Sequence, residues 1–131
     1  MQRQRGFAFT EALVALLVLS IGLIGVAALE LKALESVREG HQRALAGVAA
    51  LDAQERLWAA YRVAPSCAAL ELDRLERRWR QHWFTQSGAA LDGQAQGAIE
   101  QASCAFEITI THAQAERVRY RLELPRKSPA P

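Results

Sequence analysis

Residues 6–29, GFAFTEALVALLVLSIGLIGVAAL, dominate the fold of this chain. The eighteen residues from Ala12 to Leu29 carry no charge. As a helix rising about 1.5 Å per residue they span about 27 Å, which is enough to cross a bilayer core of roughly 30 Å. Glu11 stands at the start of this run, and an acidic side chain at the edge of a membrane-length segment is costly and usually functional. The stretch predicts a membrane helix that begins with a functional carboxylate.

The residues before the apolar run give it a direction and a cleavage point. Arg3 and Arg5 precede it, and basic residues on that side favour a cytoplasmic N-terminus. An ordinary secretory signal is cut after its apolar core, but here the candidate cut, between Gly6 and Phe7, lies before it. Cleavage at this point leaves the membrane segment on the mature protein. The alternative is a plain single-pass anchor in which Glu11 is accidental.

Length, charge and cysteine content limit the size of the remaining domain and the partners and bonds it can have. Beyond the membrane helix, roughly one hundred residues remain, which is enough for one small domain at most. The net charge is +2, and Arg3 and Arg5 supply both charges, so the trimmed side chains sum to zero and give little support for a nucleic-acid partner. Cys67 and Cys104 lie beyond the membrane helix and can form one disulfide if that part is periplasmic. No metal site is predicted, because no Cys-x-x-Cys or Cys/His ligand spacing occurs.

The helical pattern continues past the membrane segment. Apolar residues recur on one side of a 3.6-residue wheel and charged residues lie mostly on the other. The apolar side is formed by Leu34, Val37, Ala44, Leu45, Val48, Leu51 and Trp58. We expect one continuous helix from about Phe9 to about Arg62, whose amphipathic half, residues 31–63, lays this side against the small domain. His41 falls within the stripe and is expected to be a partly buried packing residue.

Residues 64–124 are predicted to form the small domain, the head. Pro65 ends the long helix, because a proline disfavours helical geometry in the residue before it. A shorter helix follows, with an apolar stripe made by Leu72, Leu75, Trp79 and Trp83. Residues 87–97 contain three glycines and are predicted to be a loop.

Two runs of alternating apolar and polar residues follow, at 106–111 and 118–124. With the connecting stretch 112–117 they predict an antiparallel β-hairpin. The expected class is therefore α+β: a long N-terminal helix packed on a small antiparallel sheet or hairpin, with a short second helix. The tail, residues 125–131, is proline-rich and is expected to be disordered.

The basic leader ending in Gly6, with a glutamate five residues later, resembles the class III signal of type IV pilins and pseudopilins. A long N-terminal helix followed by a small antiparallel sheet is similar to the pilin architecture. The resemblance implies that residues 1–6 are a leader removed by prepilin peptidase, that Phe7 becomes N-methylated, and that residues 7–30 are the transmembrane half of the helix. It also implies that Glu11 pairs with the N-terminal amine at Phe7 of a neighbouring subunit and so sets the axial stagger between subunits.

The run ALVALLVLSIGLIGVAAL, residues 12–29, resembles the PilV-type minor pilins, also called type IV pilus modification proteins. Cys104 before a Thr-rich strand and the late strand with Tyr120, Leu122 and Leu124 are also similar. The resemblance implies a minor type IV pilin in the bacterial inner membrane, with a cytoplasmic N-terminus and a periplasmic head, that moves into the pilus or its tip-priming complex at the cell surface. The implied partners are other minor and major pilins, prepilin peptidase, the inner-membrane assembly platform and membrane lipid.

Two other functions remain open. A minor pseudopilin of a type II secretion system would share the leader, Glu11 and the long helix, and only the run at residues 20–23 favours the pilus. A DNA-binding pilin for uptake could use a basic, stacking surface. Its residues would be Arg74, Arg77, Arg78 and Arg80 with Trp79 and Trp83. Acidic neighbours and a near-neutral mature charge weigh against nucleic acid.

An enzyme is not expected. His41, His82 and His112 are scattered along the chain, and the sequence has no His-Glu-x-x-His pair, phosphate loop or nucleophile elbow. Glu11 has no acid–base partner in the chain. No catalytic residue, metal or cofactor is predicted.

Overall fold

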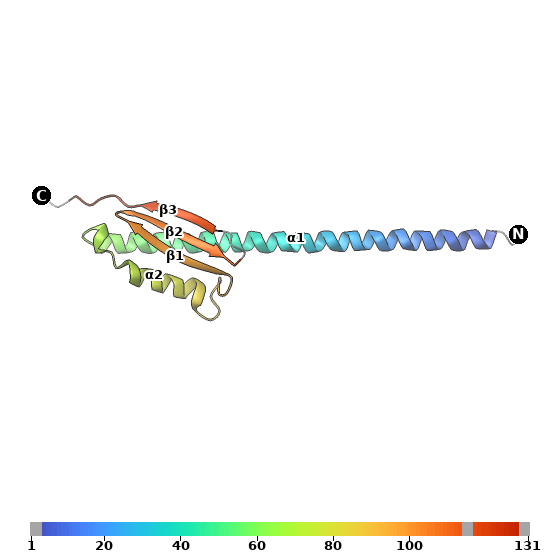
Figure 1. Ribbon diagram of the computed structural model, residues 1–131, viewed down its shortest axis with the longest axis horizontal. Coiled ribbons are helices and arrows are strands. Elements are labelled where there is room, and N and C mark those ends of the chain that lie inside the picture. Colours follow the sequence, from blue (N-terminus) through green and yellow to red (C-terminus); the bar gives the residue numbers. More distant parts are fainter. Residues whose placement is uncertain (1–3, 114–116, 129–131) are drawn as a thin grey trace. The chain divides into compact units, whose positions relative to one another are not determined.

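The computed structural model describes residues 4–113 and 117–128. It confirms the predicted α+β class, with a long N-terminal helix, a short helix and a small antiparallel sheet (Figure 1). The elements in chain order are α1 (Gln4–Val63), the 3-10 turn η1 (Cys67–Ala69), α2 (Leu72–Arg80), the π-helical turn η2 (Gln81–Thr85), β1 (Ala95–Ala102), β2 (Ala105–His112) and β3 (Arg117–Glu123). The chain divides into two compact units, Met1–Gly40 and His41–Pro131.

The first unit is the part of α1 up to Gly40, and its described side chains are exposed. Two hydroxyl groups in it are satisfied inside the helix. Thr10 Oγ1 donates to the carbonyl oxygen of Phe7 at 2.9 Å, and Ser20 Oγ donates to that of Leu16 at 2.7 Å. Such internal bonds let a hydroxyl residue lie in lipid without an unpaired donor. By length and composition, α1 can cross a membrane.

The second unit contains a three-stranded antiparallel sheet in the order β1-β2-β3 (Figure 1). Ala95 of β1 pairs with His112 of β2, and Ile108 of β2 pairs with Tyr120 of β3. Alternate residues of a strand point to the same face, and on β2 one set is wholly buried: Phe106, Ile108, Ile110 and His112. The predicted hairpin is confirmed as β2 and β3, although residues 114–116 of its connection lie outside the described residues.

The first strand includes residues that the sequence pattern predicts to be a loop. The prediction of a loop over residues 87–97 is wrong at its end, because β1 begins at Ala95. Ile99 is the only β-branched residue in this strand, so its own preference for strand geometry is weak and the pairing with β2 holds it. The two-residue turn between β1 and β2 has Ser103 at a φ of 61°, in a type of turn where glycine is usual.

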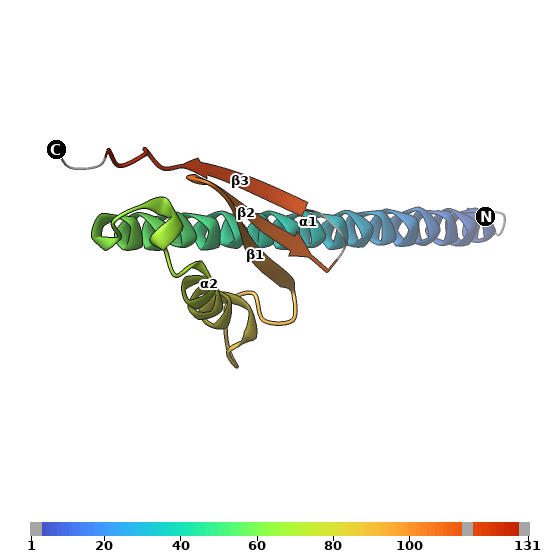
Figure 2. The ribbon, with the colours of Figure 1, turned by 60° about the vertical axis from the view of Figure 1, so that its left-hand side comes forward.

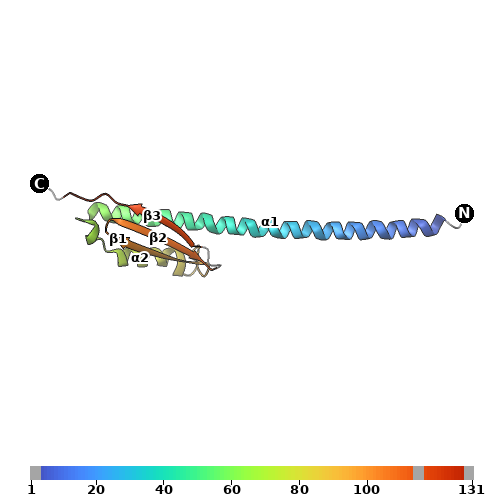
Figure 3. The ribbon, with the colours of Figure 1, turned by 45° about the horizontal axis from the view of Figure 1, so that its top comes forward.

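The face of α1 that packs on the sheet differs from the predicted one. It consists of small residues until its last two turns: Ala46, Ala49, Ala50, Ala53, Leu57 and Tyr61. Val48, Leu51 and Trp58, which were expected to pack, are exposed by 51%, 60% and 39%, and His41 is exposed rather than partly buried. The strands lie across this part of α1 (Figure 2, Figure 3). Alanine leaves room on this side of α1 for the large side chains of the sheet and α2, and the ring of Trp79 reaches the helix backbone at Ala49.

The segment after α1 brings two aromatic rings into this core. Trp79 of α2 is fully buried, and its Nε1–H donates to the carbonyl oxygen of Ala49 at 2.8 Å. The chain then widens into η2, which changes the angular positions of the side chains that follow. Phe84 therefore packs edge-on against Trp79, with ring centroids 5.2 Å apart. Trp83 is only half-buried, and its Nε1–H donates to Asp52 Oδ2 at 2.8 Å.

Two long-range contacts hold the end of α1. Cys67 and Cys104 form a disulfide with their Cα atoms 5.4 Å apart, which ties η1 to the β1–β2 turn. Lys127 Nζ donates to the carbonyl oxygens of Tyr61, at 2.6 Å, and Ala64. The same ammonium lies 4.6 Å from the centroid of the Tyr61 ring. A cation at this place complements the negative end of the helix dipole.

The tail therefore differs from the prediction of disorder over residues 125–131. Its described part forms no helix or strand, but Tyr61 Oη donates to the carbonyl oxygen of Pro125 at 2.5 Å, and Lys127 is bound at the end of α1. The beginning of the tail is anchored to the end of α1, and residues 129–131 lie outside the described residues.

Candidate functional site

The predicted processing site lies in the first turns of α1. Gly6 and Phe7 are both helical and exposed, and the exposed fraction of Phe7 is 76%. A Cβ added to Gly6 would meet no atom within 4 Å, so packing within the chain does not require glycine there. Residues 1–3 of the predicted leader lie outside the described residues. A glycine requirement at Gly6 would therefore come from the cleaving enzyme and not from the fold.

Glu11 lies one helical turn after Phe7, on the same side of α1. Its carboxylate is exposed, and it makes no hydrogen bond or ion pair with any residue in the described ranges. An unpaired charge moved into apolar surroundings costs several kcal/mol. If this part of α1 packs among other apolar helices, Glu11 needs a cation from another chain or from a newly formed amine.

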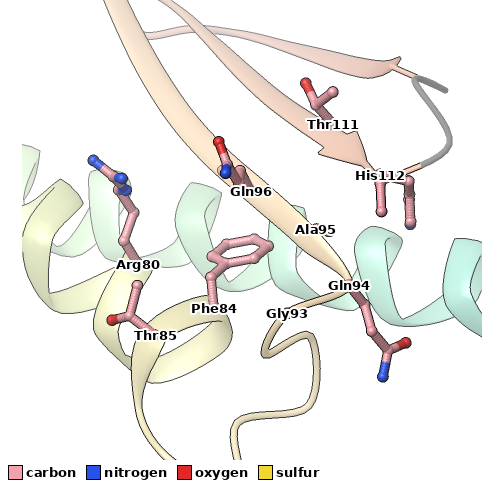
Figure 4. A pocket seen from close by; sticks show the side chains of 11 residues that line it. Arg80, Phe84, Thr85, Gly93, Gln94, Ala95, Gln96, Thr111 and His112 are labelled. Carbon is pink, nitrogen blue, oxygen red and sulfur yellow. The ribbon is translucent and has the colours of Figure 1, made fainter.

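The head has a cavity of about 500 Å³ beside the start of β1 (Figure 4). The ring of Phe84 projects into it, and its polar lining residues are Arg80, Thr85, Gln94, Gln96, Thr111 and His112. His112 is only 7% exposed, and neither of its ring nitrogens has a hydrogen-bond partner among the described residues. Both nitrogens are themselves buried, so His112 is not placed to bind or act on a molecule in the cavity.

The structure separates the residues that a DNA-binding pilin would use. Trp79 is fully buried and cannot stack on a base, and Trp83 is half-buried with its indole nitrogen bonded to Asp52. Two of the four arginines pair with carboxylates of the same segment, at 3.6 and 3.9 Å: Arg74 with Glu71 and Arg80 with Glu76. The combination of free basic charge and open aromatic faces that DNA binding would require is absent from this described segment.

The histidines also do not form a shared site. His41 and His82 are exposed, whereas His112 is buried. Within residues 4–113 and 117–128, no group of three or more His, Cys, Asp or Glu side chains is placed to hold a metal ion.

Sequence reasoning missed the contacts of Lys127. This residue and Tyr61 are 66 positions apart, and the chain around Lys127 shows no helical or strand periodicity. A cation following the last strand of a small domain is too common a pattern to predict which helix end it caps.

Comparison with known protein families identifies the N-terminal part of the chain. The model of the prokaryotic N-terminal methylation motif matches residues 1–27, which include Gly6, Phe7, Glu11 and most of the apolar run. No curated protein and no solved structure matches the chain. With the long helix and small antiparallel sheet, the motif supports a protein of the type IV pilin and pseudopilin class.

A prepilin-type motif implies processing by prepilin peptidase and assembly with other pilins. The motif and the apolar start of α1 together fit a pilin-like protein anchored in the inner membrane.

Proposed function

We propose that this chain is a minor type IV pilin of the PilV type. It is inserted in the inner membrane and then assembled with other minor and major pilins into the pilus or its tip-priming complex. The observation that carries the proposal is the methylation motif at residues 1–27 on a chain whose remainder is one small α+β head closed by a disulfide. The similarity of residues 12–29 to PilV-type sequences supports this subfamily.

In this role the first residues have separate tasks. Gly6 is the last residue of the leader, and its open surroundings leave the bond to Phe7 accessible to prepilin peptidase. Cleavage converts the peptide nitrogen of Phe7 into a cationic amine, which is then N-methylated. Glu11, which has no partner among the described residues, pairs with that amine on a neighbouring subunit, because both charges would otherwise be buried unpaired in the filament.

The proposed role is structural rather than catalytic. Two polar contacts join α1 to itself and to the following helical segment: Asp52 Oδ2 accepts from Arg56 and from Trp83, each at 2.8 Å. The indole N–H of Trp79 donates to the carbonyl oxygen of Ala49 on α1. These contacts support a rigid module that presents a surface to other subunits.

A minor pseudopilin of a type II secretion system is the second candidate, since the methylation motif is common to both classes. Deleting the gene distinguishes them. The proposal predicts loss of surface pili and twitching with normal protein secretion, whereas a secretion defect with normal pili would assign the chain to the secretion system. DNA uptake is the third candidate, and the burial of Trp79 weakens it.

The cleavage step is tested by mass spectrometry of the mature N-terminus. We expect a chain that begins at N-methylated Phe7. Replacing Gly6 with a bulky residue should leave uncut precursor in the inner membrane, while the head still forms its disulfide, because a side chain at position 6 meets no atom within 4 Å. An intact Met1 in the wild-type protein, or a cut after Leu29, would exclude this mechanism.

A further inference from the structure

The last strand of the sheet has an outer side that no other strand pairs with. β3 stands at the end of the strand order β1-β2-β3 (Figure 2). Among the described residues, no backbone–backbone hydrogen bond joins residues 117–123 to a segment other than β2. This side of β3 therefore presents a row of backbone N–H and C=O groups, to which another extended chain can add.

The register shows which residues of β3 direct their backbone groups to this side. The N–H of Leu124 donates to the carbonyl oxygen of Cys104 at 2.8 Å, so these two residues form a hydrogen-bonded pair at the end of the β2–β3 ladder. Hydrogen-bonded and non-hydrogen-bonded pairs alternate along an antiparallel ladder. Val118, Tyr120 and Leu122 therefore bond to β2, and the residues between them point their backbone groups outward. We define the outer edge as these four residues: Arg117, Arg119, Arg121 and Glu123.

The side chains of the outer edge alternate with an apolar row that is incompletely covered. Successive residues of a strand point to opposite faces. The three arginines are exposed on the face of the sheet that points away from the core. The residues between them, Val118, Tyr120 and Leu122, are only half-buried, whereas their partners on β2 are fully buried. A further strand beside β3 would cover this row.

The arginines give the outer edge a positive charge with a regular spacing. Arg119 Nε lies 3.8 Å from Glu107 Oε1, whereas Arg117 and Arg121 have no ion pair with a residue in the described ranges. Alternate residues of an extended chain recur at about 6.8 Å, and this spacing is the same in β3 and in any strand added to it. Carboxylates at alternate positions of an added strand would therefore each face one arginine.

We propose that the outer edge binds an extended segment of another protein in which acidic and apolar residues alternate, added antiparallel to β3. The backbones exchange hydrogen bonds, the carboxylates face the arginines, and the apolar side chains cover Val118, Tyr120 and Leu122. Antiparallel addition continues the pairing of the sheet and is the more stable arrangement per residue. The outer edge lies wholly within the second unit, so this binding is independent of the kind of filament that the chain joins.

Two other occupants fit the outer edge less well. A second copy of β3 would bring the arginines of two edges together, and like charges across a strand pair oppose association. A single-stranded nucleic acid would find positive charge but no aromatic ring on which its bases could stack. The described residues of β1 and β2 on this face carry no aromatic side chain: Gln96, Ala98, Glu100, Ala102, Ala105, Glu107, Thr109 and Thr111.

The test is a titration of the full-length chain, in detergent micelles, with a short synthetic peptide of alternating glutamate and valine capped at both ends. Amide hydrogen exchange is followed residue by residue by nuclear magnetic resonance. We expect the peptide to slow exchange at the outward amides of Arg119 and Arg121 and to leave exchange in β1 unchanged. Protection at these amides reports backbone pairing, which attraction between charges alone would not produce.

Methyl groups on the peptide backbone test the geometry without altering the protein. In antiparallel addition the glutamates lie opposite the arginines and direct their N–H groups to β3, whereas the valines direct theirs away. N-methylated glutamates should abolish the protection, and N-methylated valines should preserve it.

A pair of matched variants tests the charge. Arg119→Gln combined with Arg121→Gln should weaken peptide binding by about tenfold, because two cross-strand ion pairs are lost. Arg77→Gln combined with Arg78→Gln, the same change at exposed positions of α2, should leave the affinity unchanged.

Each other outcome overturns the inference. Unchanged exchange with the alternating peptide would show that the charged edge only prevents sheets from aggregating. Equal protection by a peptide with its glutamates in one block, or by a single-stranded thymidine oligonucleotide, would show a general attraction for polyanions. Slower exchange on raising the protein concentration alone would make the edge a self-association surface. Loss of protection with N-methylated valines would exclude antiparallel addition.

Discussion

Gly97→Ala should destabilise the head by overpacking its core. Gly97 is buried on β1 and pairs with Ile110. A Cβ built at Gly97 would lie 2.5 Å from Trp79 Cη2, 2.6 Å from Trp79 Cζ3 and 2.5 Å from Phe84 Cε2. Real Cβ atoms do not approach other heavy atoms this closely, so at least one ring must move.

The two rings have little freedom to move. Trp79 is 0% exposed and its Nε1–H is bonded to the backbone of α1, and Phe84 is 5% exposed and packed against Trp79. Forcing a methyl group into a core of this density costs roughly 1–3 kcal/mol. For a domain of about this size, each kcal/mol lowers the unfolding midpoint by about 4–8 °C. The expected loss in Tm is therefore roughly 5–20 °C.

The measurement is thermal unfolding of the full chain in detergent micelles, followed by near-ultraviolet circular dichroism, which reports the packing of Trp79. Gly47→Ala is the matched control. Gly47 lies inside α1, and its added Cβ would meet only Tyr120 Oη at an ordinary 3.7 Å. Alanine is the better helix former by about 1 kcal/mol, so this variant should unfold at a higher temperature. A Gly97→Ala midpoint equal to or above that of the wild type would refute the packing argument.

Three further changes test other parts of the molecule. Replacing Cys67 and Cys104 with serine should lower the stability of the head by about 3–4 kcal/mol for a separation of 37 residues, and readily alkylated thiols in the unreduced wild type would contradict the bond. Lys127→Met should lower the stability of the head by about 0.3–1 kcal/mol, because the C-terminal end of α1 loses its capping cation. Arg126→Met should leave the stability nearly unchanged. Equal unfolding midpoints for the two variants would contradict the capping role. Glu11→Ala and Glu11→Gln should both leave cleavage and membrane level near normal but reduce the amount in sheared pili on immunoblots, and normal incorporation of both would remove the pairing mechanism.

Much of the fold is predictable because its pattern is local. The alternation in residues 106–111 and 118–124 corresponds to β2 and β3, since a strand with one buried face needs that period wherever it occurs. The apolar run after Glu11 is long enough to define a helix by itself. The strand β1 was missed because only Ile99 favours it and its turn uses Ser103 in place of glycine, so the pairing partner decides its geometry.

The candidate site also has features set by local sequence and features set by distant contacts. The motif that contains Gly6, Phe7 and Glu11 is visible in the sequence, because its residues stand at fixed offsets along the chain, and the roles of these three residues stay predictions. The partners of Lys127 and the bond of the Trp79 indole to Ala49 could not be predicted, because they depend on residues 66 and 30 positions away.

The sequence by itself determined the membrane-length helix, the processing motif, and the antiparallel pairing of the last two strands. Only the tertiary structure decided which side of α1 forms the core. Both sides are apolar, one with large residues such as Leu51 and one with alanines such as Ala49 and Ala53. A hydrophobic period predicts that a helix is amphipathic, but it cannot choose between two apolar sides. The choice depends on how much room the facing side chains need. The ring of Trp79 reaches the backbone at Ala49, and the large side chains of β2 are fully buried beside it, so small residues fit best on α1 between Ala46 and Ala53.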